Sequence, residues 1–104
     1  MTEKISKKDL RADVELLTGR GIYSTANIKG KDEYRMSIPW HGGYRRALFA
    51  DVPQEVWEKC NTKRDQLIRA LEVANPQLRG HITTGYHIGA GIYLSLRVSN
   101  GVLA

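Results

Sequence analysis

Residues 51–76, DVPQEVWEKCNTKRDQLIRALEVANP, carry the helix that decides the fold. Asp51 is a favourable N-cap, Pro53 suits a first helical turn, and Asn75-Pro76 ends the segment. The apolar positions recur at the spacing of one helical face. They are Val56, Trp57, Cys60, Leu67, Ile68, Leu71 and Ala74. The pattern predicts a long amphipathic helix whose apolar stripe packs on the core.

Alternating residues after this helix predict a β-hairpin. Residues 81–88 lead through a glycine-containing turn, residues 89–91, into residues 92–98. The last strand alternates most regularly, because the apolar set Ile92, Leu94, Leu96 and Val98 alternates with Tyr93, Ser95, Arg97 and Ser99. We expect the apolar set to face the core.

Residues before the long helix predict one more helix and three strands. Ser6 and Asp9 form a capping-box pattern, and residues 10–17 repeat apolar side chains on one helical face. Strands are expected at residues 22–28, 34–40 and 44–50, with Trp40 facing inward. Pro39 lacks an amide donor, which places the end of its strand at a sheet edge or just past the ladder. The predicted order is α-β-β-β-α-β-β, an α+β fold in which an antiparallel sheet packs against the long helix.

Length and composition indicate one domain spanning residues 1–104, with a folded core at about 6–99. Apolar residues make up 41% and charged residues 26%, which is typical of a globular protein rather than a disordered one. The first residues lack the apolar stretch of a signal peptide, and no apolar run approaches the roughly 20 residues that span a bilayer. Cys60 has no partner for an internal disulfide. We therefore expect a cytoplasmic protein without membrane contact.

Positive charge is the main functional signal. The net charge is +5 and the pI is about 9.6, which favours a partner of negative charge. Basic side chains concentrate in adjacent predicted turns and strands among aromatic residues: Lys29, Lys31, Arg35, Arg45 and Arg46. They indicate a nucleic-acid contact through a β-sheet face; the alternative is a solvated face whose charges oppose aggregation.

A string within this region resembles a known class of DNA-binding domain. Residues 31–38, KDEYRMSI, are followed by a glycine pair, by residues 45–49, RRALF, and then by an acidic cap and a helix. The arrangement is similar to the three-stranded sheet and helix of the arm-binding domains of tyrosine integrases and of the plant ethylene-response DNA-binding domain. The resemblance implies that Arg35, Arg45 and Arg46 enter a major groove.

The sequence contains no recognisable catalytic or metal-binding motif. His41, His81 and His87 are scattered, and Cys60 lies on the apolar stripe of the long helix. We assign no catalytic residue, metal or cofactor; metal-free RNA cleavage by two of the histidines is the activity that comes nearest.

Two functions therefore stay open. The first is a non-catalytic protein that binds nucleic acid, DNA in the first instance. The second is a protein-binding regulator or inhibitor of the phage or mobile-element accessory type, for example an anti-defence protein, that occupies a partner's surface. Trp40 or Tyr93 would then be an exposed anchor. An exposed strand edge of the last hairpin is also expected to allow a homodimer.

Overall fold

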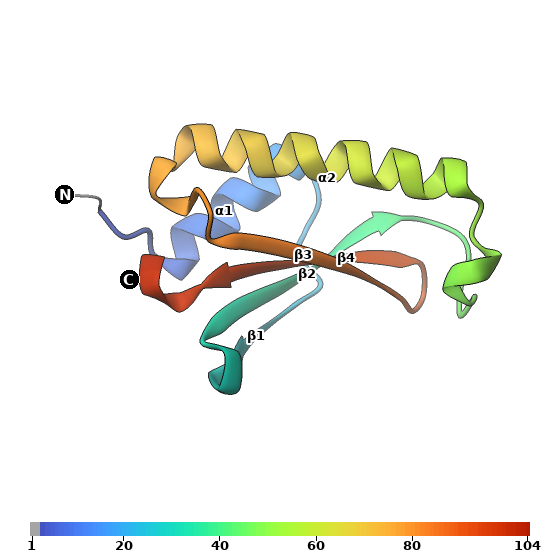
Figure 1. Cartoon of the computed structure of the whole chain (residues 1–104), viewed down its shortest axis with the longest axis horizontal. Helices are drawn as coiled ribbons and strands as arrows, with labels where there is room; N and C mark the ends of the chain where they lie inside the picture. The colour runs from blue at the N-terminus through green and yellow to red at the C-terminus, as the bar shows by residue number, and fades with distance from the viewer. Residues whose placement is uncertain (1–2) are drawn as a thin grey trace.

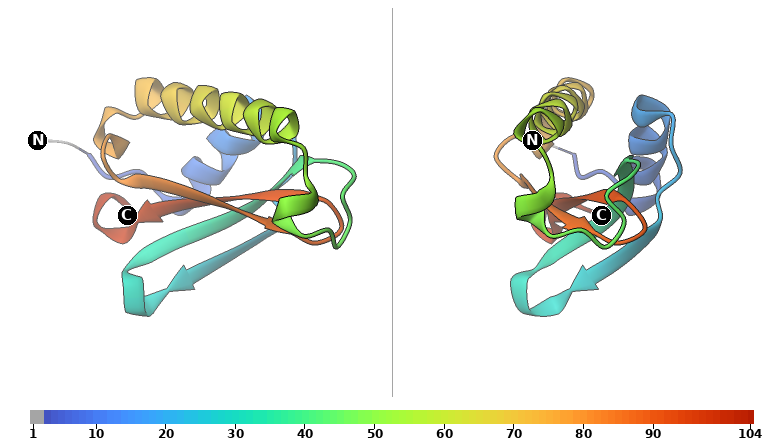
Figure 2. Two further views of the ribbon diagram at one scale, coloured as in Figure 1. Left: turned by 45° about the vertical axis from the view of Figure 1, so that its right-hand side comes forward. Right: turned by 90° about the vertical axis from the view of Figure 1, so that its right-hand side faces the viewer.

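The computed structural model describes residues 3–104 as an α+β domain with two layers. Both helices lie over the same face of a four-stranded sheet, and no helix of the described chain covers the other face (Figures 1 and 2). The elements follow in the order α1 (Lys7–Thr18), β1 (Ser24–Ile28), β2 (Glu33–His41), α2 (Gln54–Ala74), β3 (Ile82–Ile88) and β4 (Ile92–Ser99). The α+β class and the antiparallel sheet against a long helix are confirmed.

The sheet order is β1-β2-β4-β3, and all neighbouring strands are antiparallel. The central strands β2 and β4 come from opposite ends of the chain and pair along most of their length. Met36 lies opposite Leu96, and Ile38 lies opposite Leu94. Because side chains alternate between faces, this register points the apolar residues of both strands toward the helices.

The core lies between the central strands and the two helices. Leu10 and Val14 of α1 are fully buried, as are Cys60 and Leu71 of α2. They pack against the inward side chains of β2 and β4, which are Tyr34, Met36, Ile38, Trp40, Ile92, Leu94, Leu96 and Val98. Each buried aliphatic side chain stabilises the fold by about 1.5–3 kcal/mol. The predicted facing of both strands is confirmed.

Local capping signals determine where α1 begins and ends. The Ser6 hydroxyl accepts a hydrogen bond from the Asp9 amide at 3.0 Å, and Gly19 ends α1 in the left-handed region with φ 67°. The N-cap of α2 is Pro53, whereas the predicted cap, Asp51, lies in a short 3-10 turn, Phe49–Asp51. The long helix is therefore confirmed, but its expected Asp51 cap is wrong.

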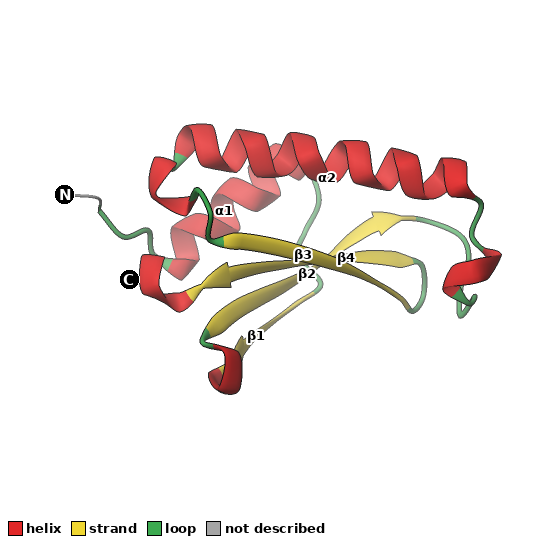
Figure 3. Cartoon of the chain, in the orientation of Figure 1, coloured by secondary structure: helices red, strands yellow, loops and turns green. Residues whose placement is uncertain are grey.

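The third predicted strand, residues 44–50, does not form. Tyr44 and Arg46 have φ values of 56° and 55°, a left-handed backbone that a strand does not contain. The Arg46 amide instead donates to the Gly89 carbonyl at 3.0 Å, which holds this segment against the β3–β4 turn as the loop before α2 (Figure 3). The observed order is α-β-β-α-β-β, and the three-stranded DNA-binding sheet implied by the resemblance lacks its last strand.

Candidate functional site

The sheet face that points away from the helices is the candidate site, and we call it the open face. Cross-strand pairing and the alternation of side chains define its members. They are Ser24, Ala26 and Ile28 of β1, Glu33, Arg35, Ser37 and Pro39 of β2, Tyr93, Ser95, Arg97 and Ser99 of β4, and Thr83, Gly85 and His87 of β3. Polar and small side chains predominate, so this face is not a second core layer.

Two arginines lie opposite one another at the centre of the open face. Arg35 on β2 pairs in register with Arg97 on β4, and their side chains are 29% and 32% exposed. The Nε of Arg35 donates to Oε2 of Glu33 at 2.8 Å, and the Nε of Arg97 lies 4.0 Å from the same oxygen. The Glu33 carboxylate therefore interacts with both guanidinium groups, and the three side chains together carry a net charge of +1.

The electrostatic state of Glu33 follows from these contacts. The hydrogen bond from Arg35 lowers the pKa of the Glu33 carboxyl, and the positive charges of Arg35, Arg97 and Lys31 act in the same direction against its partial desolvation. Glu33 is therefore ionised at neutral pH. The Nε of Arg97 is buried and forms no hydrogen bond within the described chain.

A trough of small side chains lies beside the arginines. Ser24, Ser37, Ser95 and Gly85 follow one another across the four strands. The hollow over this part of the sheet has a volume of about 330 Å³. Gly85 is required for the arrangement, since a Cβ atom there would lie 2.8 Å from Nη2 of Arg97. The Arg97 guanidinium thus reaches across Gly85 into the trough.

Aromatic rings line the other side of the trough. The rings of His87 and Tyr93 stack with centroids 5.0 Å apart at an angle of 8°, and Tyr23 contacts Tyr93 at 5.2 Å. Neighbouring strands are about 4.8 Å apart, so rings stacked across two strands stand on edge above the sheet. Tyr93 contacts a ring on each side, whereas Tyr23 is 69% exposed and His87 is also exposed.

The five basic residues predicted to contact nucleic acid do not form one cluster. Arg35 lies on the open face, whereas Lys29 and Lys31 are exposed in the turn between β1 and β2. Arg45 and Arg46 are exposed in the loop beyond the far end of β2. Since β2 has nine residues, roughly 27 Å of strand separates the two groups. Arg97 was missed as a site residue, although the alternation of the last strand already placed it opposite the apolar set.

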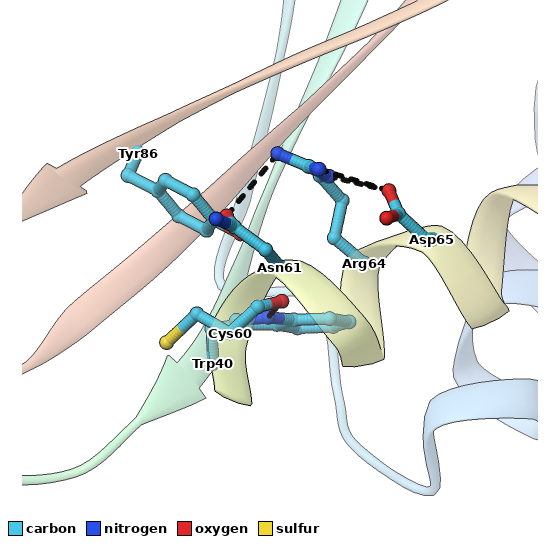
Figure 4. Close-up of polar contacts among 6 residues, drawn as sticks. All are labelled: Trp40, Cys60, Asn61, Arg64, Asp65 and Tyr86. Carbon is cyan, nitrogen blue, oxygen red and sulfur yellow. Dashed lines mark hydrogen bonds and ion pairs between the residues drawn. The ribbon is translucent and has the colours of Figure 1, made fainter. Parts of the chain in front are cut away.

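Trp40 is a core residue, so its predicted role as an exposed anchor is wrong. Its side chain is 3% exposed, and its indole N–H donates to the Cys60 carbonyl at 3.0 Å (Figure 4). The Lys63 ammonium lies 4.8 Å from the ring centroid and donates to the Trp40 carbonyl at 2.8 Å. Pro39 lacks an amide hydrogen, but side chains still alternate along β2 at this position. Trp40 therefore points into the core. Tyr93, the other predicted anchor, is half-buried on the open face.

A polar network ties α2 to the edge strand β3. The Tyr86 hydroxyl donates to Oδ1 of Asn61 at 2.9 Å, and Arg64 donates both to that oxygen and to Asp65 (Figure 4). Burial is the main cause that raises the pKa of Tyr86 to about 12. A phenol that stays protonated and donates to a neutral amide is a structural contact, so we assign this network to the packing of β3 on α2.

The histidines occupy three different positions. His41 ends β2 and stacks on Tyr44 at 6.2 Å, His81 precedes β3, and His87 lies on the open face. Among residues 3–104, no three His, Cys, Asp or Glu side chains come together as a metal site. Within the same range, no helix is both long enough and apolar enough to cross a membrane.

Comparison with known proteins identifies no family for this chain. The chain matches no protein-family description, no curated protein and no solved structure.

Proposed function

We propose that the protein binds single-stranded nucleic acid across the open face of its sheet. The observation that carries the proposal is the pair Arg35 and Arg97, side by side on the two central strands and sharing one carboxylate. Guanidinium groups bind phosphate oxygens in a bidentate manner. The trough beside them gives a backbone room to approach, and the net charge of +5 favours a polyanion.

The dimensions of the sheet favour a single strand over a duplex. Four strands at about 4.8 Å spacing are roughly 14 Å across before side chains are added. A B-DNA major groove is about 12 Å wide and admits a helix or a two-stranded ribbon. The open face is therefore too wide to enter the groove, whereas an extended single strand can lie along it, as on other sheet platforms.

The aromatic residues suit unpaired bases at the rim of the face. Tyr93 has a ring on each side, so bases would stack on the exposed surfaces of Tyr23 and His87. Such stacking contributes about 1–3 kcal/mol per base. Four residues of β4, about 13 Å, separate Arg97 from Tyr93, so phosphates and bases would use different rows of the same face.

Binding to a labelled single strand at several salt concentrations tests the proposal. Arg35→Gln combined with Arg97→Gln should weaken binding and reduce the slope of log K against log salt by about 1.4, since each lost phosphate contact on a single strand is worth about 0.7. The matched control is Arg45→Gln with Arg46→Gln, which removes the same charge from the loop before α2. Thermal melting checks that both double variants fold.

The reverse result would contradict the proposal. If Arg45→Gln with Arg46→Gln lowers the slope of log K against log salt and the Arg35/Arg97 variant does not, the binding surface lies in the loop at the end of β2. Preference for a duplex over the single strand of the same sequence would also count against the width argument.

A protein-binding regulator or inhibitor remains the second candidate. Apolar side chains exposed outside the open face support it, with Leu16 82%, Leu48 71% and Val73 70% exposed. Absence of nucleic-acid binding even at low salt would favour this candidate and make the positive charge incidental.

We also propose that two copies of the chain form a homodimer by pairing their β3 edge strands. Residues Ile82–Ile88 form an edge strand and contain no proline and no Lys, Arg, Asp or Glu, the residues that usually protect an edge. Sedimentation velocity of the wild type and of Thr83→Lys tests it, since a charge at this exposed position of the edge strand should prevent pairing.

A further inference from the structure

A second candidate surface lies on the helical side of the molecule. A groove of about 290 Å³ runs between the end of α1 and the middle of α2. Its walls include Leu17 of α1, Lys63 and Ala70 of α2, and Trp40 of β2. A shallower apolar hollow shares Ala70 with it and continues along α2 to Val73. The two hollows together follow α2 for about ten residues, or roughly 15 Å, and we call them the helix groove.

Two cations without a counter-ion mark one end of the helix groove. Arg20 donates to the Pro39 carbonyl at 3.3 Å, and Lys63 donates to the next carbonyl, that of Trp40, at 2.8 Å. Within residues 3–104, neither side chain forms an ion pair with a carboxylate. Burial lowers the pKa of the Lys63 ammonium, and the positive charge of Arg20 lowers it further. The negative charge of an anion bound between the two would oppose this lowering.

The other end of the helix groove is apolar and open to solvent. Leu17 is 46% exposed and Val73 is 70% exposed. Leu17 belongs to the apolar set of α1, but its two predecessors on that face, Leu10 and Val14, are fully buried. Removing such side chains from water on binding is favourable. A polyanion such as nucleic acid would leave this apolar end unused.

We propose that the helix groove docks a segment of a partner protein in which a carboxylate lies next to apolar side chains. The carboxylate binds between Arg20 and Lys63, and the apolar side chains cover Leu17, Ala70 and Val73. The groove fits a peptide better than a free small acid because it continues along α2 beyond the cationic end. The surface is separate from the open face, so it does not depend on the nucleic-acid proposal.

Selection from a displayed library of random peptides tests this proposal on the full chain. Peptides of about 12 residues are long enough to span the groove as a helix. We expect the enriched peptides to carry Asp or Glu beside Leu, Ile or Phe. The best peptide, synthesised and labelled, should lose at least about tenfold in affinity when its acidic residue is replaced by the amide.

Variants of the protein then locate the site. Arg20→Gln with Lys63→Gln should weaken the peptide at least about tenfold, whereas Lys59→Gln, which removes a charge from an exposed position of α2, should not. Val73→Glu should also block binding; it leaves both cations in place and changes an exposed residue, so the fold is preserved. All these variants should bind a labelled single-stranded oligonucleotide as the wild type does.

Several results would overturn the proposal. They are failure of the library to enrich any peptide, enrichment without acidic residues, and binding that is insensitive to both the Arg20/Lys63 and Val73 variants. Self-association that Val73→Glu abolishes, with no peptide enriched, would identify a second copy of this chain as the occupant and equally reject a foreign peptide.

Discussion

Replacing Gly85 by alanine should weaken nucleic-acid binding while leaving the stability of the fold almost unchanged. An added Cβ would lie 2.8 Å from Nη2 and 3.4 Å from Cζ of Arg97, and the first distance is too short for these atoms to coexist. The obstructed atoms are the far end of a flexible side chain, so the guanidinium can move aside without disturbing the backbone of β3 or β4. The displaced guanidinium would then no longer reach the phosphate that we place in the trough.

The expected change in the free energy of unfolding is small, whereas the expected loss of binding affinity is large enough to measure. Alanine is favoured over glycine inside a strand by about 0.5–1 kcal/mol, which offsets the displacement, so the free energy of unfolding should stay within about 1 kcal/mol of the wild type. A hydrogen bond to a charged group contributes about 1.5–3 kcal/mol. Because Arg97 is displaced and not deleted, we expect about half of this loss, or an affinity about three- to tenfold lower.

A double-mutant cycle with Arg97→Ala shows whether Gly85 acts through the arginine. Fluorescence anisotropy with a labelled single strand gives the affinities, and urea denaturation gives the free energies of unfolding. In the Arg97→Ala background, Gly85→Ala should have no further effect on binding, because there is no guanidinium to displace. Additive losses of affinity would refute the reasoning, as would a loss of stability above about 2 kcal/mol from Gly85→Ala alone.

Three further predictions follow from the described contacts. Trp40→Ala should lower the free energy of unfolding by about 3–5 kcal/mol in urea denaturation, as expected for a buried aromatic residue; a cost below about 1 kcal/mol would show that the ring is exposed. Glu33→Gln should strengthen single-strand binding, because it frees Arg35 and Arg97 from their shared carboxylate. The wild type should approach this variant only as the pH falls below 4.5, since the folded-state pKa of Glu33 is lowered from that value; equal affinities at neutral pH would contradict the charge assignment. In a spectroscopic tyrosinate titration, one tyrosine should titrate at about 12 and disappear in Tyr86→Phe. Because folding raises this pKa from 10.0, the stabilisation it contributes should be complete below pH 10 and be lost as the pH rises toward 12.

The sequence alone predicted those features that depend on near neighbours in the chain. The helix of residues 54–74 and the facing of residues 92–98 follow from apolar residues at periods of about 3.6 and 2, which the backbone geometry imposes locally. The cap formed by Ser6 and Asp9 closes within three residues. Such signals do not require knowledge of the rest of the fold.

Tertiary structure decided everything that depends on which distant segments meet. Residues 44–50 have strand-forming side chains, but a strand also needs a partner edge, and β4 and β1 already occupy both edges of β2. The loop therefore adopts turns and exposes Leu48 and Phe49.

Both candidate binding surfaces are also products of distant contacts. Arg35 and Arg97 become neighbours only because strands from opposite halves of the chain pair in one register. Arg20 and Lys63 share a groove only because α1 and α2 pack on the same face of the sheet. Local periodicity places a charged side chain on the outer face of its own element, but the charges it meets there are set by long-range pairing and packing.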